Sequence, residues 1–203
     1  MSQLELALES LRRGECVAIL DDENREAETD LFFPALSLKP SQLRQLRLEA
    51  GGEMYISVGT EVAASFGIPY IGEALGRPEA IAASPVLKGL GKGVDGMCQG
   101  SCSVGLSLDH RSTHTGAPDV ERSLTCRRLA ELWGEISAAD PPLSSEEAMR
   151  RLGKEFHTPG HIFLCIENRK GLEIRRGHTE LSVALARLAG VSPIMVRLFF
   201  LLG

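Results

Sequence analysis

Short apolar runs alternate with helical stripes along this 203-residue chain, and this alternation most narrows the folds open to it. A stripe of leucines from Leu4 to Leu11 predicts a short helix ended by Gly14, and the apolar run 16–20 then predicts a buried strand. No glycine fingerprint stands at a strand-to-helix turn, which argues against a dinucleotide-binding fold and a phosphate-loop ATPase. We therefore expect an α/β fold, arranged as a three-layer helix-sheet-helix domain.

The remaining elements follow from the same patterns. Pro34 stops the second strand, and Ser144-Ser145-Glu146-Glu147 opens a capped helix. The region 67–100 is rich in glycine and contains prolines, so we expect an irregular, mobile surface excursion there. Further strands are expected at 31–34, 54–58, 104–108, 162–166, 172–174 and 194–202, and further helices at 42–49, 61–66, 119–133 and 179–188.

Length and charge limit the classes of protein to consider. A chain of 203 residues with no linker is expected to form a single domain over 1–203. The net charge is −5 with scattered basic residues, which argues against a nucleic-acid partner. No apolar stretch approaches the length that spans a bilayer, and the N-terminus lacks a secretory pattern. We expect no membrane association and a cytoplasmic location.

The five cysteines are dispersed, which in a reducing compartment favours free thiols over a disulfide framework. Cys98 and Cys102 have a spacing that could hold a metal, but no second pair with zinc spacing accompanies them. The thiols are Cys16, Cys98, Cys102, Cys126 and Cys165.

The segment from Asp21 to Asp30 packs six acids and one arginine into ten residues between two expected strands. Such a density of like charge is relieved by a bound cation, and carboxylate oxygens suit Mg²⁺ or Mn²⁺. A solvated acidic surface loop is the alternative interpretation.

Three other polar segments are candidates for chemistry. Arg175-Arg176-Gly177-His178-Thr179 leads into an expected helix and suits an anion such as phosphate, although a simple helix cap fits equally well. His161, at a strand entrance after Pro159-Gly160, suits a general acid or base, although a lone histidine is more often structural. The polar loop 109–116, including Thr115, could bind substrate hydroxyls or be only a turn.

Taken in order, these segments resemble the 3,4-dihydroxy-2-butanone-4-phosphate synthase family of riboflavin biosynthesis. The similar motifs are Asp-Asp-Glu-Asn-Arg-Glu-x-Glu-x-Asp-Leu, Thr-Gly followed by Glu121-Arg122-x-x-Thr125, Pro-Gly-His-x-Phe, Arg-x-Gly-His-Thr-Glu, and Leu188-Ala189-Gly190-x-x-Pro193. They cover most of the chain and are specific as a set.

The resemblance implies a mixed, twisted sheet, a homodimer with sites near the interface, and the conversion of ribulose 5-phosphate, or a related sugar phosphate, to formate and a four-carbon phosphate. It also implies Mg²⁺ or Mn²⁺ as cofactor. Glu26 and His178 would bind the metal, and His161 would be a catalytic acid/base. The remaining substrate-binding residues would be Arg25, Asp30, Thr115, Arg175, Arg176, Gly177 and Thr179, with Glu26 and His178 also contacting the substrate.

The chain also departs from the family pattern. Phe199 stands where the family has a catalytic glutamate, so Glu28 or water would have to substitute in the standard reaction. There are four other departures. Tyr55 stands where a cysteine is common, Thr29 replaces a glycine, Pro118 replaces a serine and Thr158 replaces an arginine. Two hypotheses follow: a lyase with altered or impaired activity, and a catalytically inactive paralogue that binds ligand or a partner.

Overall fold

The computed structural model describes residues 2–90 and 104–200, apart from the side chains of Leu90, Phe199 and Phe200. A six-stranded sheet with the order β1-β2-β6-β3-β5-β4 crosses the centre of the described chain. Only β3 and β5 pair in parallel, so the sheet is mixed, as the resemblance implied. The strands are β1 Val17–Leu20, β2 Thr29–Pro34, β3 Gly51–Val58, β4 Val104–His110, β5 Phe156–Ile166 and β6 Ile194–Phe200.

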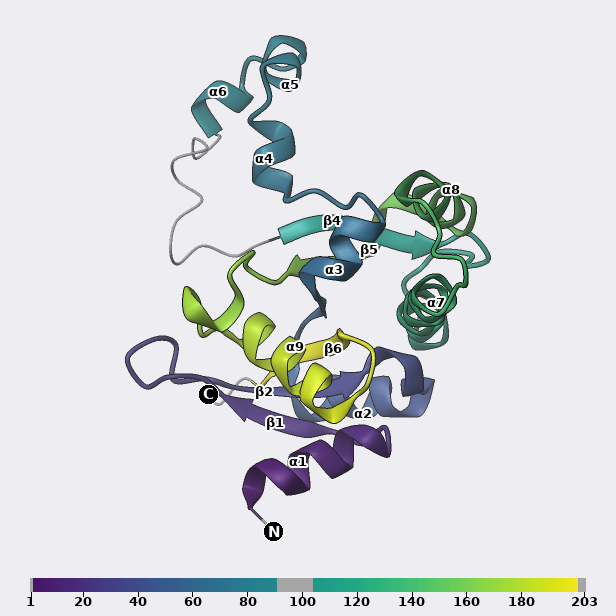
Figure 1. The fold of residues 1–203 in the computed structure, drawn as a ribbon. Coiled ribbons are helices and arrows are strands. Elements are labelled where there is room, and N and C mark those ends of the chain that lie inside the picture. The colour runs from purple at the N-terminus through teal and green to yellow at the C-terminus, as the bar shows by residue number, and fades with distance from the viewer. Residues whose placement is uncertain (1, 91–103, 201–203) are drawn as a thin grey trace.

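Helices cover both faces of the sheet, which confirms the predicted three-layer α/β architecture (Figure 1). Two of them, α1 and α9, pack together against β1 and β2, while α2 and α7 pack on the opposite face. The helices are α1 Gln3–Arg12, α2 Pro40–Glu49, α3 Thr60–Ser65, α4 Ile71–Leu75, α5 Pro78–Ala83, α6 Leu87–Leu90, α7 Asp119–Ser137, α8 Ser145–Glu155 and α9 His178–Ala189, with short 3₁₀ turns at Ala35–Ser37 and Gly171–Glu173.

Two apolar clusters correspond to the two faces of the sheet. The larger one contains the alternate residues Ile162, Leu164 and Ile166 of β5 together with α2 and α7. The smaller one places Phe32 of β2 and Met195 of β6 beneath α1 and α9. Because side chains alternate along a strand, the residues between these positions face the other layer or solvent. This alternation decides which polar side chains reach the functional site.

Several sequence expectations were wrong in detail. No strand forms at 172–174, because Gly171, at φ 54°, turns the chain into a 3₁₀ turn. The region expected to be irregular contains α4, α5 and α6, which extend away from the sheet at the top of Figure 1, and its residues 91–100 lie outside the described residues. The strand expected to be buried, β1, is at the sheet edge and exposes alternate residues, including Leu20.

Among the described residues, Cys16, Cys126 and Cys165 form no disulfide, as predicted, and burial raises the pKa of the Cys16 thiol to about 11. Cys98 and Cys102 lie outside the described residues, so the possible thiol site there stays a prediction. Among the described residues, no helix is long and apolar enough to cross a membrane.

Candidate active site

The acidic segment forms the loop between the antiparallel strands β1 and β2. Asp21 closes the base of this loop: its backbone N–H donates to the Glu28 carbonyl at 3.2 Å, and its Oδ1 accepts from the Glu28 N–H at 3.0 Å. Asp21 is 5% exposed and Asp30 is fully buried, whereas Asp22 and Glu23 face solvent. The acids therefore divide into a buried group and a solvated group.

His178, the first residue of α9, lies buried against this loop. Its Nε2 is 3.0 Å from the Glu28 carbonyl oxygen, which fixes Nε2 as the donor, and its ring stacks on Phe32 at 6.3 Å. In the neutral imidazole, Nδ1 then carries the lone pair, and this nitrogen faces the carboxylates of the loop. Glu28 thus contributes to this geometry through its backbone.

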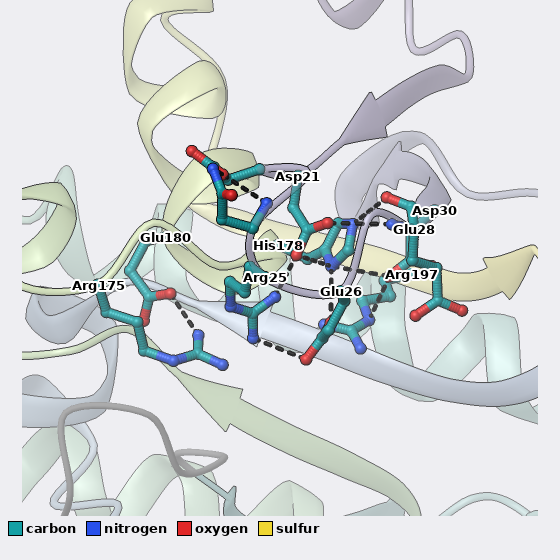
Figure 2. Close-up of polar contacts among 11 residues, drawn as sticks. Asp21, Arg25, Glu26, Glu28, Asp30, Arg175, His178, Glu180 and Arg197 are labelled. Atoms are coloured by element: carbon teal, nitrogen blue, oxygen red, sulfur yellow. Dashed lines mark hydrogen bonds and ion pairs between the residues drawn. The ribbon is translucent and has the colours of Figure 1, made fainter.

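Figure 2 shows the carboxylates of Asp21, Glu26 and Asp30 converging on His178 Nδ1. Glu26 Oε2 and Asp30 Oδ2 are each 3.5 Å from Nδ1, and Asp21 Oδ2 is 4.0 Å away. Among the described residues, the buried Nδ1 has no hydrogen-bond partner. We call Asp21, Glu26, Asp30 and His178 the His178 cluster.

The donor set of the His178 cluster fits a divalent cation. Asp21, Glu26 and His178 each offer one ligand atom, and these atoms lie within 4.8 Å of one another. The carboxylate oxygens suit Mg²⁺ or Mn²⁺, and the imidazole nitrogen would add a third protein ligand. The structure thus brings the predicted ligands Glu26 and His178 together and adds Asp21, which the sequence marked only as part of the acidic loop.

Two arginines balance this negative charge. Arg25 hydrogen-bonds Asp21 and pairs with Glu26 Oε1 at 2.8 Å, so a residue predicted to hold the sugar also braces the loop. Burial alone would raise the pKa of Asp21, but the Glu28 N–H and Arg25 hold it below its ordinary value. Arg197 of β6, only 9% exposed, places Nε 3.0 Å from Asp30 Oδ2. The sequence signal for Arg197 was a single charge within an apolar strand.

The start of α9 provides a second feature beside the loop. Thr179 is buried, Arg176 is exposed, and Arg175 pairs with Glu180 while its Nε finds no hydrogen-bond partner in the described chain. A Cβ on Gly177 would lie 2.4 Å from the Arg175 guanidinium, so glycine permits this close approach. Helix N–H groups beside two arginines form an anion-binding corner.

His161 lies in a different place, on β5 near the opposite edge of the sheet from the acidic loop. Its Nδ1 is 2.6 Å from Asp109 Oδ2, and its backbone N–H donates to Asp109 Oδ1 at 3.0 Å. Asp109 is 2% exposed, whereas 48% of the His161 side chain is exposed. We call these two residues the His161 pair. The partner of His161 lies 52 residues earlier, in a loop that the sequence marked only as polar.

The loop after β4 supports the His161 pair. Gly116, at φ 77°, contacts the Asp109 carboxylate so closely that a Cβ there would lie 2.2 Å from Oδ2. The neighbouring Thr115 is held by Glu121, whose carboxylate accepts hydrogen bonds from the backbone N–H groups of Thr115 and Gly116. Thr115, predicted to bind substrate, therefore lies with the His161 pair, and no hydrogen bond or ion pair within the described residues joins it to the His178 cluster.

The two groups are separated by two strands. Asp30 is on β2 and His161 on β5, with β6 and β3 between them. Three strand spacings amount to about 14 Å, which is beyond direct contact. The side chain of Phe199, predicted to replace a catalytic glutamate, lies outside the described part of the structure, but its backbone pairs with Asp30.

Comparison with known proteins identifies the family. The family model for 3,4-dihydroxy-2-butanone 4-phosphate synthase matches residues 5–200. The chain belongs to this family. A synthase of that name from Methanosarcina mazei is 37% identical over 94% of this chain and 73% of the relative, and one from Archaeoglobus fulgidus is 33% identical over 93% and 75%. The resemblance drawn from the motifs is therefore confirmed.

Solved structures agree with this family assignment. A 3,4-dihydroxy-2-butanone 4-phosphate synthase in complex with two magnesium ions has a TM-score of 0.71 and 26% identity, covering 98% of this chain and 76% of that one. A two-domain synthase from A. baumannii is 24% identical with a TM-score of 0.69, and this chain spans 48% of its length. The second likeness supports the fold alone.

Proposed function

We propose that this protein is a divalent-metal-dependent carbon–carbon lyase that converts ribulose 5-phosphate, or a related sugar phosphate, to a four-carbon phosphate and formate. The observation that carries the proposal is the buried Nδ1 of His178, which has no hydrogen-bond partner among the described residues and faces the carboxylates of Asp21, Glu26 and Asp30. Family membership supplies the reaction class. The products together contain all the atoms of ribulose 5-phosphate, so no co-reactant is required.

Glu26, His178 and Asp21 would hold Mg²⁺ or Mn²⁺. When bound, such an ion polarises the sugar oxygens and acidifies a neighbouring carbon-bound proton. The protein prepares this site by fixing the His178 ring through the Glu28 carbonyl and by pairing Asp30 with Arg197. Arg25, which bridges Asp21 and Glu26, is proposed to contact the sugar as well, with Asp30 at the base of the site.

The substrate phosphate is proposed to bind at the start of α9. The N–H groups that follow Gly177, the Thr179 hydroxyl and the guanidinium groups of Arg175 and Arg176 supply donors there. This corner adjoins His178 in the sequence, so a bound sugar phosphate would extend from α9 toward the acidic loop.

Proton transfer is proposed to fall to His161. Asp109 accepts a hydrogen bond from Nδ1–H and so leaves Nε2 of His161 to exchange protons with substrate. Thr115, in the supporting loop, is proposed to contact substrate hydroxyls. Glu28 is retained as a proposed auxiliary acid/base group because its side chain belongs to the same loop as the metal ligands.

We also propose that the protein is a homodimer whose sites lie near the interface, a proposal that rests on family membership. Within each subunit, residues 1–203 are proposed to form one domain, acting in the cytoplasm.

The test incubates purified protein with ribulose 5-phosphate and Mg²⁺ or Mn²⁺ and follows formate by proton NMR. The matched controls are metal-stripped protein and the variant His178→Asn. We expect formate only from the metal-loaded parent. Absence of formate under every metal condition, with ribulose 5-phosphate still binding by calorimetry, would overturn the standard synthase reaction and favour the alternative, a catalytically inactive paralogue that binds ligand or a partner; Phe199 motivates that alternative.

A further inference from the structure

Between the His178 cluster and the His161 pair, the strand β3 carries a second oriented carboxylate. The Tyr55 hydroxyl donates a hydrogen bond to Glu53 Oε2. The Tyr55 ring is held on both sides, with the Phe163 ring centroid 6.1 Å away and the Arg197 guanidinium carbon 5.7 Å from the ring centroid. Glu53 is exposed, but its partner is fixed, and so its carboxylate has a defined position.

The sheet register places this pair on the face that carries the candidate site. Phe32, Arg197, Tyr55 and Phe163 occupy one row across β2, β6, β3 and β5, and residues that pair in this way point to the same face. Asp30 and His161 each lie two residues from a member of that row, on the same face. The pairing of β3 is irregular between Gly51 and Met54, and the hydrogen bond from Tyr55 places the Glu53 carboxylate beside this row. Glu53 is therefore about 5 Å, one strand spacing, from the line of β5 and about 10 Å from that of β2.

This part of the sheet face is open among the described residues. Met195 and Ser57, further along β6 and β3, are buried, whereas Phe163 is 46% exposed and Glu53 faces solvent. Arg197 connects the two ends, because it contacts Asp30 with Nε and Tyr55 with its guanidinium face. A molecule held at the His178 cluster and reaching toward the His161 pair would cross Glu53.

A purely structural role for Glu53 explains its hydrogen bond to Tyr55 less well than a role in proton transfer does. Glutamate is depleted in strands, and an exposed one is usually solvated without a fixed partner. Here the carboxylate is bonded to an aromatic hydroxyl that is itself oriented by a cation and a second ring. Oriented acids on an accessible face suit proton transfer.

We propose that Glu53 is a second acid/base group of the lyase, acting with His161, and that Tyr55 positions it. The inference rests on the proposed function. The Glu53 carboxylate accepts a proton from the substrate, the electron pair of the broken bond stays on the substrate, and the resulting carboxylic acid returns the proton in a later step. Tyr55 remains protonated throughout and keeps its hydrogen bond to Oε2.

The experiment compares Glu53→Gln, Glu53→Asp and Tyr55→Phe with the parent, in formate release and in exchange of substrate carbon-bound protons with D₂O. Glu49→Gln is the matched control, because Glu49 ends α2 on the opposite face and bonds only the Gln45 side chain among the described hydrogen bonds. Mn²⁺ affinity and KM report whether the site is otherwise intact.

For Glu53→Gln we expect kcat to fall by about 10²-fold or more, with KM and Mn²⁺ affinity within about threefold of the parent. Tyr55→Phe should lower kcat about tenfold, and Glu53→Asp should restore part of the loss. A parent that releases formate while Glu53→Gln keeps its kcat would overturn this inference and leave the proposed function standing. A parent that neither releases formate nor exchanges protons would overturn both.

Discussion

The His178 cluster and the His161 pair combine a histidine with carboxylates in two different environments. The His178 cluster presses three carboxylates against one buried imidazole nitrogen that has no hydrogen-bond partner in the described chain. The His161 pair satisfies its buried carboxylate fully and leaves the imidazole half exposed. A cation would complete the first arrangement, whereas the second is complete as it stands. The comparison teaches that the partners of a histidine, more than its presence in a motif, indicate whether metal ligation or proton transfer should be proposed for it.

The largest effect is expected from the His161 pair, on turnover. His161→Gln should lower kcat for formate release by about 10²–10⁴-fold, because a general acid/base group is lost, while metal affinity stays unchanged. His157→Gln, at an exposed position of the same strand, is the control. A fall in Mn²⁺ affinity for His161→Gln would show that the two regions are not separate in function.

The reverse pattern is expected for the His178 cluster. His178→Asn should weaken Mn²⁺ binding by at least about 100-fold, since even residues that only support a ligand change affinity by 10–100-fold. Calorimetric titration measures this. In the parent, metal at 100 times its Kd should raise the free energy of unfolding by about 2.7 kcal/mol, and at the same metal concentration this gain should fall to about 0.4 kcal/mol or less in His178→Asn. An undiminished gain would place the metal elsewhere.

Substitutions of Gly116 and Gly177 compare the rigidity of the two regions through the free energy of unfolding. Gly116→Ala should lower the free energy of unfolding by about 1–3 kcal/mol, because φ 77° strains a side chain and the new Cβ meets the buried Asp109. Gly177→Ala should cost less than about 1 kcal/mol, because its Cβ meets only the flexible end of Arg175. Urea unfolding of both variants decides; equal losses would contradict the assigned rigidity of the His161 pair.

The smallest effect is a pH dependence of the loop behind the His161 pair. The backbone N–H groups of His114, Thr115 and Gly116 hold the pKa of Glu121 below its ordinary 4.5. A carboxyl with a lowered folded-state pKa stabilises the fold at neutral pH, and this contribution is lost as pH falls through that pKa. Glu121→Gln should therefore be slightly less stable than the parent at pH 7, with the difference shrinking below about pH 4. A difference independent of pH would mean that charge is not involved.

Local sequence patterns predicted most helices and strands, because the residues that form or end such an element lie within it or directly beside it. The Ser144 cap, for example, is visible in sequence and accepts the Glu147 N–H in the structure. The acidic loop and His178 were joined only through the family's motifs. The partner of His161, the contact between Arg197 and Asp30, and the position of β6 between β2 and β3 depend on strand pairing, which leaves no local trace. The prediction of a strand at 172–174 was wrong because it relied on the apolar residues Leu172 and Ile174 and did not take Gly171 into account.

The position of β6 has a consequence for assembly of the protein. Within the described residues, strands β2 and β3 do not pair with each other, and the β1–β2 hairpin joins the rest of the sheet through β6 alone. Contacts between residues so far apart in sequence form slowly. During synthesis, the hairpin that carries the acidic loop would keep unpaired backbone N–H and C=O groups along β2 until residues 194–200 are synthesised and pair with it. In a nascent or truncated chain, the most exposed aggregation-prone surface would therefore be the open edges of β2 and β3.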